Sequence, residues 1–336
     1  MTGLFARIAF GGLVVAALAT PAHAQSIAMK LTTTTINEPQ HLFLIEYAKR
    51  IEAKTQGRIK GEVYPSSQLG AIPRVVEGIQ LGTIEGLIAP PGFFRGIEPA
   101  FQVTEVPGLF ADVDHAYRTL TDPSFHDPFL VVGEPKGVAV VSLWPHSAIS
   151  YATVRPLRTL ADFRGKKLRT LATKMELEAM QRVGAAGVPV DFGEMIPALQ
   201  SGAIDGVRSG LVVMLGIKVF TVAKYLTAVN DTMIPVTLSV SKAWLDKRPP
   251  DLQKAVRETG LELEPWSHDI AKDFAAKSEQ GWRDNGGEII RLSAEDQAEF
   301  MRRVAPIAEE VLGGAPDANT KRLYALLKES AAKHKK

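Results

Sequence analysis

The chain contains no cysteine, although it is 336 residues long. Disulfides, thiol nucleophiles and cysteine-ligated metals are therefore excluded, and an apolar core must hold the fold together, which a chain of this length can build. An excess of charge is also lacking, since 39 Lys and Arg stand against 37 Asp and Glu. Without a basic excess or an arginine-rich run, nucleic acid is not an expected partner.

Long apolar runs are scarce, and the most prominent one lies at the N-terminus. Residues 8–20 are apolar but too few to span a bilayer, which requires about 20 residues. A positive charge precedes the run, and small residues in an A-x-A arrangement end it at Ala24. This pattern predicts a secretory signal peptide, residues 1–24, cleaved after Ala24. The mature protein is then exported and is not expected to be embedded in a membrane.

Common catalytic motifs are missing as well. The sequence has no G-x-S-x-G, no H-E-x-x-H and no G-x-x-x-x-G-K-[ST]. Residues 239–242 match S-x-x-K, but the partner motifs S-D-N and K-T-G are absent, so a strand end followed by a helix cap is the better interpretation. The 7 histidines are scattered without metal-ligand spacing. We therefore expect no metal, no cofactor and no enzymatic activity.

Strand and helix patterns alternate along most of the chain. Residues 27–34, 59–64 and 84–89 have strand composition, and helical patterns separate them, the first capped by Asn37. Such alternation predicts an α/β fold with a largely parallel sheet. The C-terminal third is helical instead. Its predicted helices cover 251–280, 294–312 and 318–333. One short helix is predicted further upstream, at 128–132.

Two consecutive segments carry the clearest motifs of the chain. The first is RPLRTLADFRGKKLR (155–169), which reads as a turn and then a short strand ending in an arginine. The second is GAAGVPVDF (184–192), followed by EMIPALQSGAIDG (194–206). In this order they resemble the core signature of the DctP-type solute-binding proteins of TRAP transporters. Weaker matches in family order add TQGRI (55–59), YPSSQLG (64–70), VPGLFAD (106–112) and VAKYLT (222–227).

The resemblance implies a periplasmic receptor with a two-lobed Venus-flytrap fold, a long interlobe helix and C-terminal helices. Residues 25–145 would form the first part of lobe I, residues 146–231 lobe II, and residues 232–336 the return to lobe I with helices spanning both lobes. An organic carboxylate would bind in the cleft between the lobes. The receptor would then deliver it to the membrane permease subunits.

Arg169, Phe192 and Trp144 are the first ligand-binding candidates. A guanidinium holds a carboxylate through two parallel hydrogen bonds and stays charged at physiological pH, and Arg169 matches the arginine with which the family grips its ligand. Phe192 matches the aromatic that stacks on the ligand, although a core phenylalanine is an equally good interpretation. Trp144 ends a strand before the interlobe crossing and could wall the cleft or pack in the core.

Three further candidates stand where the chain departs from the family pattern. Arg208 and Ser209 replace the usual glutamate and asparagine, and Asn230 opens a pair that is usually Asn-His. A second ligand-facing arginine of the family aligns near Ile149 and is missing here. Arg208 could take its place beside Arg169, or it could pair with Asp191 or Asp231 and leave Arg169 as the only anchor.

The nature of the ligand and the role of binding stay open at this point. The aromatic candidates favour an apolar or aromatic monocarboxylate over a sugar acid, whose hydroxyl groups need more polar partners. A periplasmic sensory binding module is an alternative to transport. A periplasmic enzyme in the same cleft is a weaker alternative, because the sequence shows no nucleophile–base pair.

Overall fold

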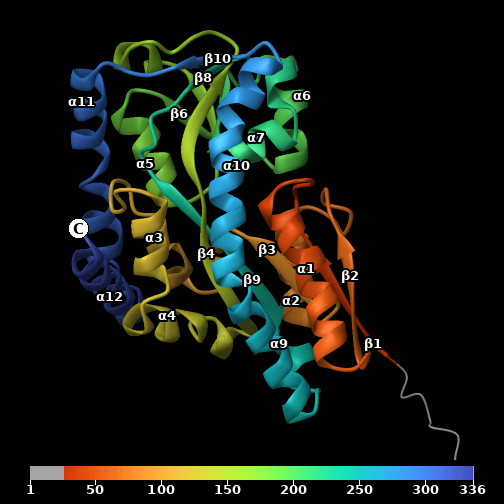
Figure 1. The fold of residues 1–336 in the computed structure, drawn as a ribbon. Coiled ribbons are helices and arrows are strands. Elements are labelled where there is room, and N and C mark those ends of the chain that lie inside the picture. The colour runs from red at the N-terminus through yellow and green to blue at the C-terminus, as the bar shows by residue number, and fades with distance from the viewer. Residues whose placement is uncertain (1–25, 336) are drawn as a thin grey trace, which may run out of the picture.

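The computed structural model describes residues 26–335, which form two lobes joined by long β-strands and a long helix (Figure 1). The predicted signal peptide, residues 1–24, and its cleavage point after Ala24 lie outside the described residues. Helices pack around one mixed sheet, so the predicted α/β fold class is confirmed. The predicted lobe boundaries, residues 145/146 and 231/232, stay a prediction.

The N-terminal strands form the outer part of the sheet in the first lobe. Strand β1 (Ile27–Thr32) pairs in parallel with β2 (Ile59–Tyr64) and β3 (Gly86–Ala89). Parallel neighbours require crossover connections, which α1 (Pro39–Lys54) and α2 (Ile72–Leu81) provide.

The start of α1 differs from the sequence prediction. The N-cap is Glu38 rather than Asn37, because the Glu38 carboxylate accepts the His41 N–H. Pro39 occupies the first turn, where a missing N–H costs nothing. This cap places a carboxylate at the edge of the interlobe region.

Two long strands carry the chain between the lobes. Strand β4 (Val138–Thr153) pairs through residues 138–148 with the antiparallel β9 (Met233–Ser241). Its remaining residues, 149–153, pair with strands of the second lobe. Strand β9 returns beside β4 and pairs on its other edge with β3. The two crossings form the connection that a hinged binding protein requires.

The second lobe is built on the far end of β4. The strands follow the order β4-β7-β5-β6, and β8 and β10 extend the other edge of β4. Helices fill the connections, including one that the sequence pattern did not predict, α7. The bounds are β5 (Lys167–Thr170), α5 (Lys174–Arg182), β6 (Ala186–Pro189), α6 (Met195–Gln200), β7 (Gly206–Gly210), α7 (Leu211–Gly216), β8 (Tyr225–Thr227) and β10 (Glu288–Ile290).

A long helix, α10 (Glu264–Asp284), runs along both lobes and packs on α1, β4 and α7 (Figure 1). The prediction of one helix over 251–280 is wrong, because α9 (Pro250–Glu262) ends before Leu263. Pro265 has no N–H and its ring clashes with the carbonyl one turn earlier, so it stands in the first turn of a new helix. The short α8 (Lys242–Leu245) precedes both.

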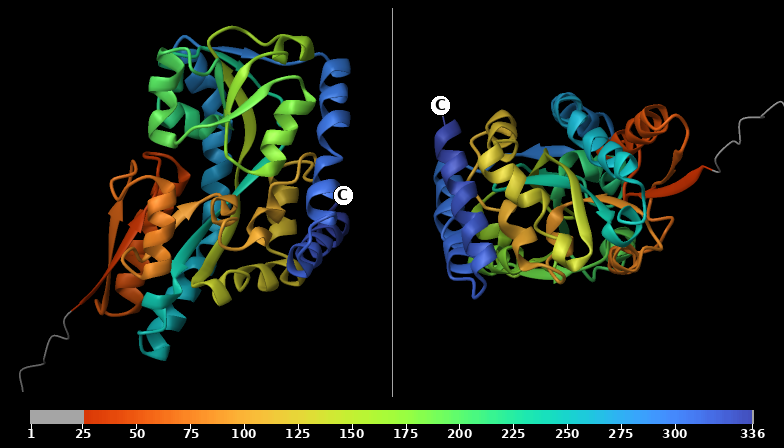
Figure 2. Two further views of the ribbon diagram at one scale, coloured as in Figure 1. Left: turned by 180° about the vertical axis from the view of Figure 1, so that it is seen from behind. Right: turned by 90° about the horizontal axis from the view of Figure 1, so that it is seen from below.

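Of the remaining helices, three cover the first lobe on the side away from β1, and the helix Ala294–Val304 packs on α5 of the second lobe. Helix α4 starts well before the predicted residue 128, because Asp122 caps it and Pro123 opens it. In both views of Figure 2 the C-terminal helices after residue 294, drawn in dark blue, lie at the opposite edge from β1 and α1. The bounds are α3 (Val113–Leu120), α4 (Pro123–Leu130), α11 (Ala294–Val304), a π-helical turn (Glu309–Gly313) and α12 (Ala318–His334).

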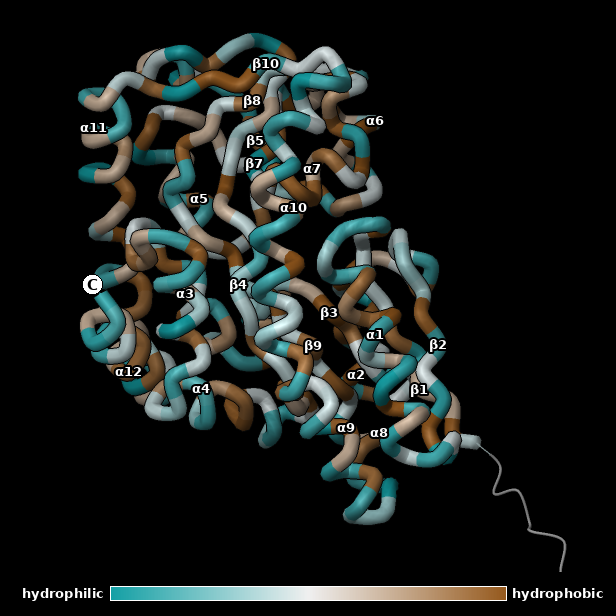
Figure 3. The backbone as a smooth tube through the Cα atoms, in the orientation of Figure 1, coloured by the Kyte–Doolittle hydropathy of each residue, from teal (hydrophilic) through white to brown (hydrophobic). Residues whose placement is uncertain are grey.

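Apolar stretches, brown in Figure 3, occur on both strands and helices. One core cluster joins β1, α1, β9 and α9, and another lies in the second lobe around Met195, Val207 and Trp282. A third and larger cluster includes residues of both lobes. Within residues 26–335, no helix has the length and apolar character needed to cross a bilayer.

Candidate functional site

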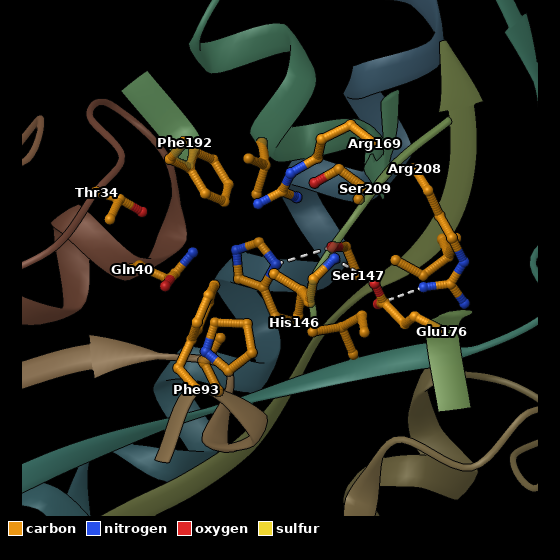
Figure 4. Close-up of a pocket in the computed structure, with 17 residues that line it drawn as sticks. Thr34, Gln40, Phe93, His146, Ser147, Arg169, Glu176, Phe192, Arg208 and Ser209 are labelled. Carbon is orange, nitrogen blue, oxygen red and sulfur yellow. Dashed lines mark hydrogen bonds and ion pairs between the residues drawn. The ribbon is translucent and has the colours of Figure 1, made fainter. Parts of the chain in front are cut away.

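A pocket lies where the two lobes meet (Figure 4). Loops of the first lobe contribute Thr34 and Phe93, and the crossing strand β4 contributes His146 and Ser147. The second lobe supplies the opposite wall from the ends of β5 and β7 and from the turn after β6. Side chains from both lobes therefore face one pocket. Its second-lobe wall includes Arg169, Phe192, Arg208 and Ser209.

Arg169 is the cationic side chain best placed to meet a ligand. It lies on β5 between β6 and β7, and only 3% of its surface is exposed. Nε donates to the Val190 carbonyl at 2.9 Å, and within residues 26–335 no other hydrogen bond of this side chain is present. Both terminal nitrogens are thus available to a carboxylate. Burial lowers the pKa of Arg169 to about 10, so the group is still charged at neutral pH.

Aromatic rings form two walls of the pocket. The guanidinium carbon of Arg169 lies 4.9 Å from the ring centre of Phe192, which belongs to the 3-10 helix η5 (Phe192–Glu194). Phe93 contributes from the first lobe, in the 3-10 helix η1 (Pro91–Phe94). Both rings are half-buried, so each has a face available to a bound molecule.

Arg208 is held by carboxylates of its own. On β7, its Nη1 donates to Glu176 at 2.5 Å and its Nη2 to Asp231 at 2.6 Å. Nη2 also donates to Thr232 Oγ1, and Nε donates to the Tyr151 hydroxyl. Burial opposes the charge of Arg208, but Asp231 and Glu176 outweigh it and raise the pKa of the guanidinium. Asp231 is one of the two partners considered for Arg208, whereas Glu176 was not foreseen.

A chain of three polar groups lies at the first-lobe side of the pocket. Glu38 Oε2 contacts His146 Nε2 at 2.7 Å, and His146 Nδ1 contacts Ser147 Oγ at 2.9 Å. Burial would raise the pKa of Glu38, but the hydrogen bonds that its carboxylate accepts from His146 and the Thr35 hydroxyl lower it instead. Sequence reasoning missed this chain, because 108 residues separate Glu38 from His146.

The other predicted ligand contacts lie in different surroundings. Ser209 is buried and lines the pocket. Trp144 is fully buried outside the pocket lining, where its ring stacks on Phe43 at 5.9 Å between centroids. Asn230 is exposed in the loop before β9, with a positive φ of 56°, and it too lies outside the lining. The structure thus brings four of the six predicted residues together.

Glu105 is a further buried acid that sequence reasoning missed. Within the described residues neither of its carboxyl oxygens has a hydrogen-bond partner, and only 3% of the residue is exposed. Burial, together with the charge of Glu176, raises the pKa of Glu105 to about 8. Glu105, Glu176 and Arg208 line one small cavity behind the pocket. Among residues 26–335 no group of three or more His, Asp or Glu is arranged to hold a metal ion.

Residues 32–313 match a family described as "Bacterial extracellular solute-binding protein, family 7". The chain belongs to this family. Among relatives, the 2,3-diketo-L-gulonate-binding periplasmic protein YiaO of Escherichia coli is 28% identical over 258 residues, covering 76% of this chain and 78% of the relative. The C4-dicarboxylate-binding periplasmic protein DctP of Rhodobacter capsulatus is 27% identical over 299 residues, covering 88% and 89%.

The fold is also that of a solved family member. A TRAP periplasmic solute binding protein from Desulfovibrio salexigens, crystallised with orotic acid, superposes with a TM-score of 0.86. Its sequence identity is 24%, and the match covers 92% of this chain and 99% of that one. The predicted resemblance to TRAP solute-binding proteins and the predicted two-lobed architecture are therefore confirmed. The chain described here is therefore a solute receptor of the TRAP type.

Proposed function

We propose that this receptor binds an organic monocarboxylate in the interlobe pocket, with Arg169 as the anchor of the carboxylate. One observation carries the proposal: Arg169 is buried at the pocket wall, and its terminal nitrogens have no protein partner within the described residues. A desolvated guanidinium is costly unless an anion compensates it. A planar carboxylate compensates it with two parallel hydrogen bonds.

The choice of a monocarboxylate follows from the charges around the pocket. The family's second arginine would align near Ile149, which is apolar and 2% exposed. Arg208 lines the pocket, but Glu176 and Asp231 occupy its nitrogens. A single anionic group of the ligand therefore finds a cationic partner, and a second one would not. The rings of Phe93 and Phe192 favour a flat or apolar body on the ligand.

Known ligands of relatives agree with a carboxylate in this place. The relatives named above bind 2,3-diketo-L-gulonate or C4-dicarboxylates, and the solved structure contains orotic acid, a ring carrying one carboxylate. Of these, orotic acid is closest to the ligand class inferred here. Phe192 and Ser209 complete the proposed contacts on the second lobe, while Arg208 supports them by holding Glu176 in place.

Export and delivery complete the proposed role. The signal peptide, cleaved after Ala24, would place the mature protein in the periplasm. Ligand contacts from Arg169 on one lobe and Thr34 and Phe93 on the other stabilise the closed form, because only that form makes both sets. The closed receptor would then be recognised by the membrane permease subunits of a TRAP transporter.

One arrangement of side chains in the structure bears on the alternative that the protein is an enzyme. The order carboxylate–imidazole–hydroxyl in Glu38, His146 and Ser147 is that of a hydrolase relay. However, a Cβ on Gly210 would overlap Ser147 Oγ, so backbone closely covers one side of this hydroxyl. Only 6% of Ser147 is exposed. We therefore favour a hydrogen-bonding role for the three groups.

Thermal-shift measurements with matched pairs test the ligand class. Benzoate is compared with benzamide, and orotate with its amide, since each pair differs only in the charged group. Succinate and fumarate report on dicarboxylates. We expect the melting temperature to rise with a monocarboxylate and not with its amide. Equal shifts for acid and amide, or a strong preference for dicarboxylates, would contradict the proposal.

A further inference from the structure

We propose that Glu38 fixes the tautomer of His146, and that this tautomer makes Ser147 a hydrogen-bond acceptor inside the pocket. The receptor would then select carboxylic acids that also carry an N–H or O–H donor. This inference rests on the proposed function, because it assigns the recognition of the part of the ligand that Arg169 does not hold.

The argument begins at Glu38, whose oxygens only receive hydrogens. Oε1 accepts from the Thr35 hydroxyl at 2.5 Å and from the His41 N–H at 3.2 Å. Oε2 contacts His146 Nε2 at 2.7 Å. An ionised carboxylate has no hydrogen to donate. Nε2 of His146 must therefore carry the hydrogen of this contact.

The other ring nitrogen follows from the first. In a neutral imidazole with its hydrogen on Nε2, Nδ1 is an acceptor. Its neighbour at 2.9 Å is Ser147 Oγ, so the serine donates its hydrogen to the ring. The hydroxyl has only one hydrogen, and only lone pairs are left to face the pocket. Gly210 leaves room for the hydroxyl in this position, because any larger residue there would overlap it.

This arrangement discriminates between ligands by whether one polar group of the ligand is a hydrogen-bond donor or an acceptor. A ligand N–H or O–H that reaches Ser147 completes the chain of hydrogen bonds. A ligand ether or carbonyl oxygen in the same place would set lone pair against lone pair in a buried site. Leaving a buried polar group without a partner lowers affinity by about tenfold to a hundredfold.

One substitution is expected to reverse the polarity of Ser147. In Glu38→Gln, the Thr35 hydroxyl and the His41 N–H hold the amide oxygen where Oε1 stands now. The amide NH₂ then faces His146 Nε2 and must donate to it. The imidazole hydrogen moves to Nδ1 and is donated to Ser147 Oγ. The serine hydrogen is released toward the pocket, so Ser147 becomes a donor.

Nitrogen-15 NMR of the imidazole side chains tests the tautomer without any ligand. His146→Gln identifies the signals of His146. At about pH 7.5 we expect the Nε2–H form in the wild-type protein and the Nδ1–H form in Glu38→Gln. Glu46→Gln serves as the matched control, since it removes a carboxylate from the outer side of the same helix and should change nothing. A doubly protonated ring or an Nδ1–H form in the wild-type protein would overturn the proposal.

Calorimetric titration with two ring pairs tests the selectivity. Pyrrole-2-carboxylate and furan-2-carboxylate have nearly the same shape, but the pyrrole ring carries an N–H donor where the furan ring carries an oxygen acceptor. The corresponding 3-carboxylates place this ring nitrogen or oxygen further from the carboxylate that Arg169 holds. We expect the wild-type protein to favour pyrrole in one of the two pairs and Glu38→Gln to favour furan there. Ser147→Ala should bring the ratio close to one. A ratio that Glu38→Gln leaves unchanged would refute the inference.

Failure here can be told apart from failure of the proposed function. If monocarboxylates bind through Arg169 but the tautomer of His146 or the ratio of pyrrole to furan affinities differs from the expectation, only the proposed role of Ser147 is refuted. If amides bind as well as acids, the anchor itself is wrong, whatever the tautomer of His146.

Discussion

Replacing Arg208 and Arg169 by methionine, one at a time, should affect stability in opposite ways. Both guanidinium groups are 3% exposed, but their partners differ. Arg208 contacts the buried carboxylates of Glu176 and Asp231, whereas the only hydrogen bond of the Arg169 side chain within the described residues goes to a carbonyl oxygen. Methionine fills a similar volume without charge. The comparison therefore separates a structural arginine from one kept for a ligand.

The magnitudes follow from these contacts. Arg208→Met leaves two buried carboxylates without a cation, which costs about 3–5 kcal/mol, or roughly 6–15 °C in melting temperature. Burial lowers the pKa of Arg169 from its ordinary value to about 10. That shift corresponds to about 3 kcal/mol of unfavourable charge burial. The folded-state pKa is depressed, so the whole penalty applies below about pH 10 and diminishes as the pH rises above that value.

Arg169→Met should therefore leave the ligand-free protein as stable as the wild type or up to about 3 kcal/mol more stable at neutral pH. Urea denaturation followed by circular dichroism measures both variants. Lowering the pH should reduce the deficit of Arg208→Met, because protonated carboxyl groups need no cationic partner. Equal destabilisation of the two variants, or none in Arg208→Met, would refute this assignment of the two arginines.

Three further predictions concern the surroundings of the pocket. The pKa of Glu105 is raised to about 8, so the wild-type protein should lose stability as the pH rises from about 5.5 to 8.5; Glu105→Gln should lose up to about 3 kcal/mol less, measured by urea denaturation. Unchanged pH dependence would contradict the burial argument. Gly210→Ala should weaken carboxylate binding about tenfold or more in calorimetry, because the new methyl group displaces the Ser147 hydroxyl; undiminished affinity would show that this hydroxyl is not needed. Trp144→Phe should keep its affinity within about twofold, because the ring lies outside the pocket lining; a large loss would return Trp144 to the site.

Local patterns predicted much of the fold. Strand β2 has the predicted bounds. The sequence did not predict that β4 runs without a break from one lobe into the other, because a strand that crosses two lobes shows no change of pattern at the crossing. The break before Pro265 was missed because the apolar periodicity continues through it.

The site was predictable only where it repeats a family motif. Arg169 and Phe192 lie together because both sit at the ends of adjacent strands in the second lobe. Glu38, His146 and Glu176 were missed, since their contacts join distant segments and depend on side chains rather than on periodicity. For the same reason the sequence left two partners open for Arg208, and only the fold places Asp231 beside it.

The affinity of Arg169→Met for the best monocarboxylate tests the central claim most directly. Arg164→Met is the matched control, since Arg164 precedes the same strand but is exposed. Loss of a charge-assisted, bidentate contact should weaken binding at least a hundredfold in calorimetry, on the order of 3 kcal/mol, while the control binds normally. If the folded Arg169→Met protein binds the acid as tightly as the wild type, Arg169 is not the carboxylate anchor.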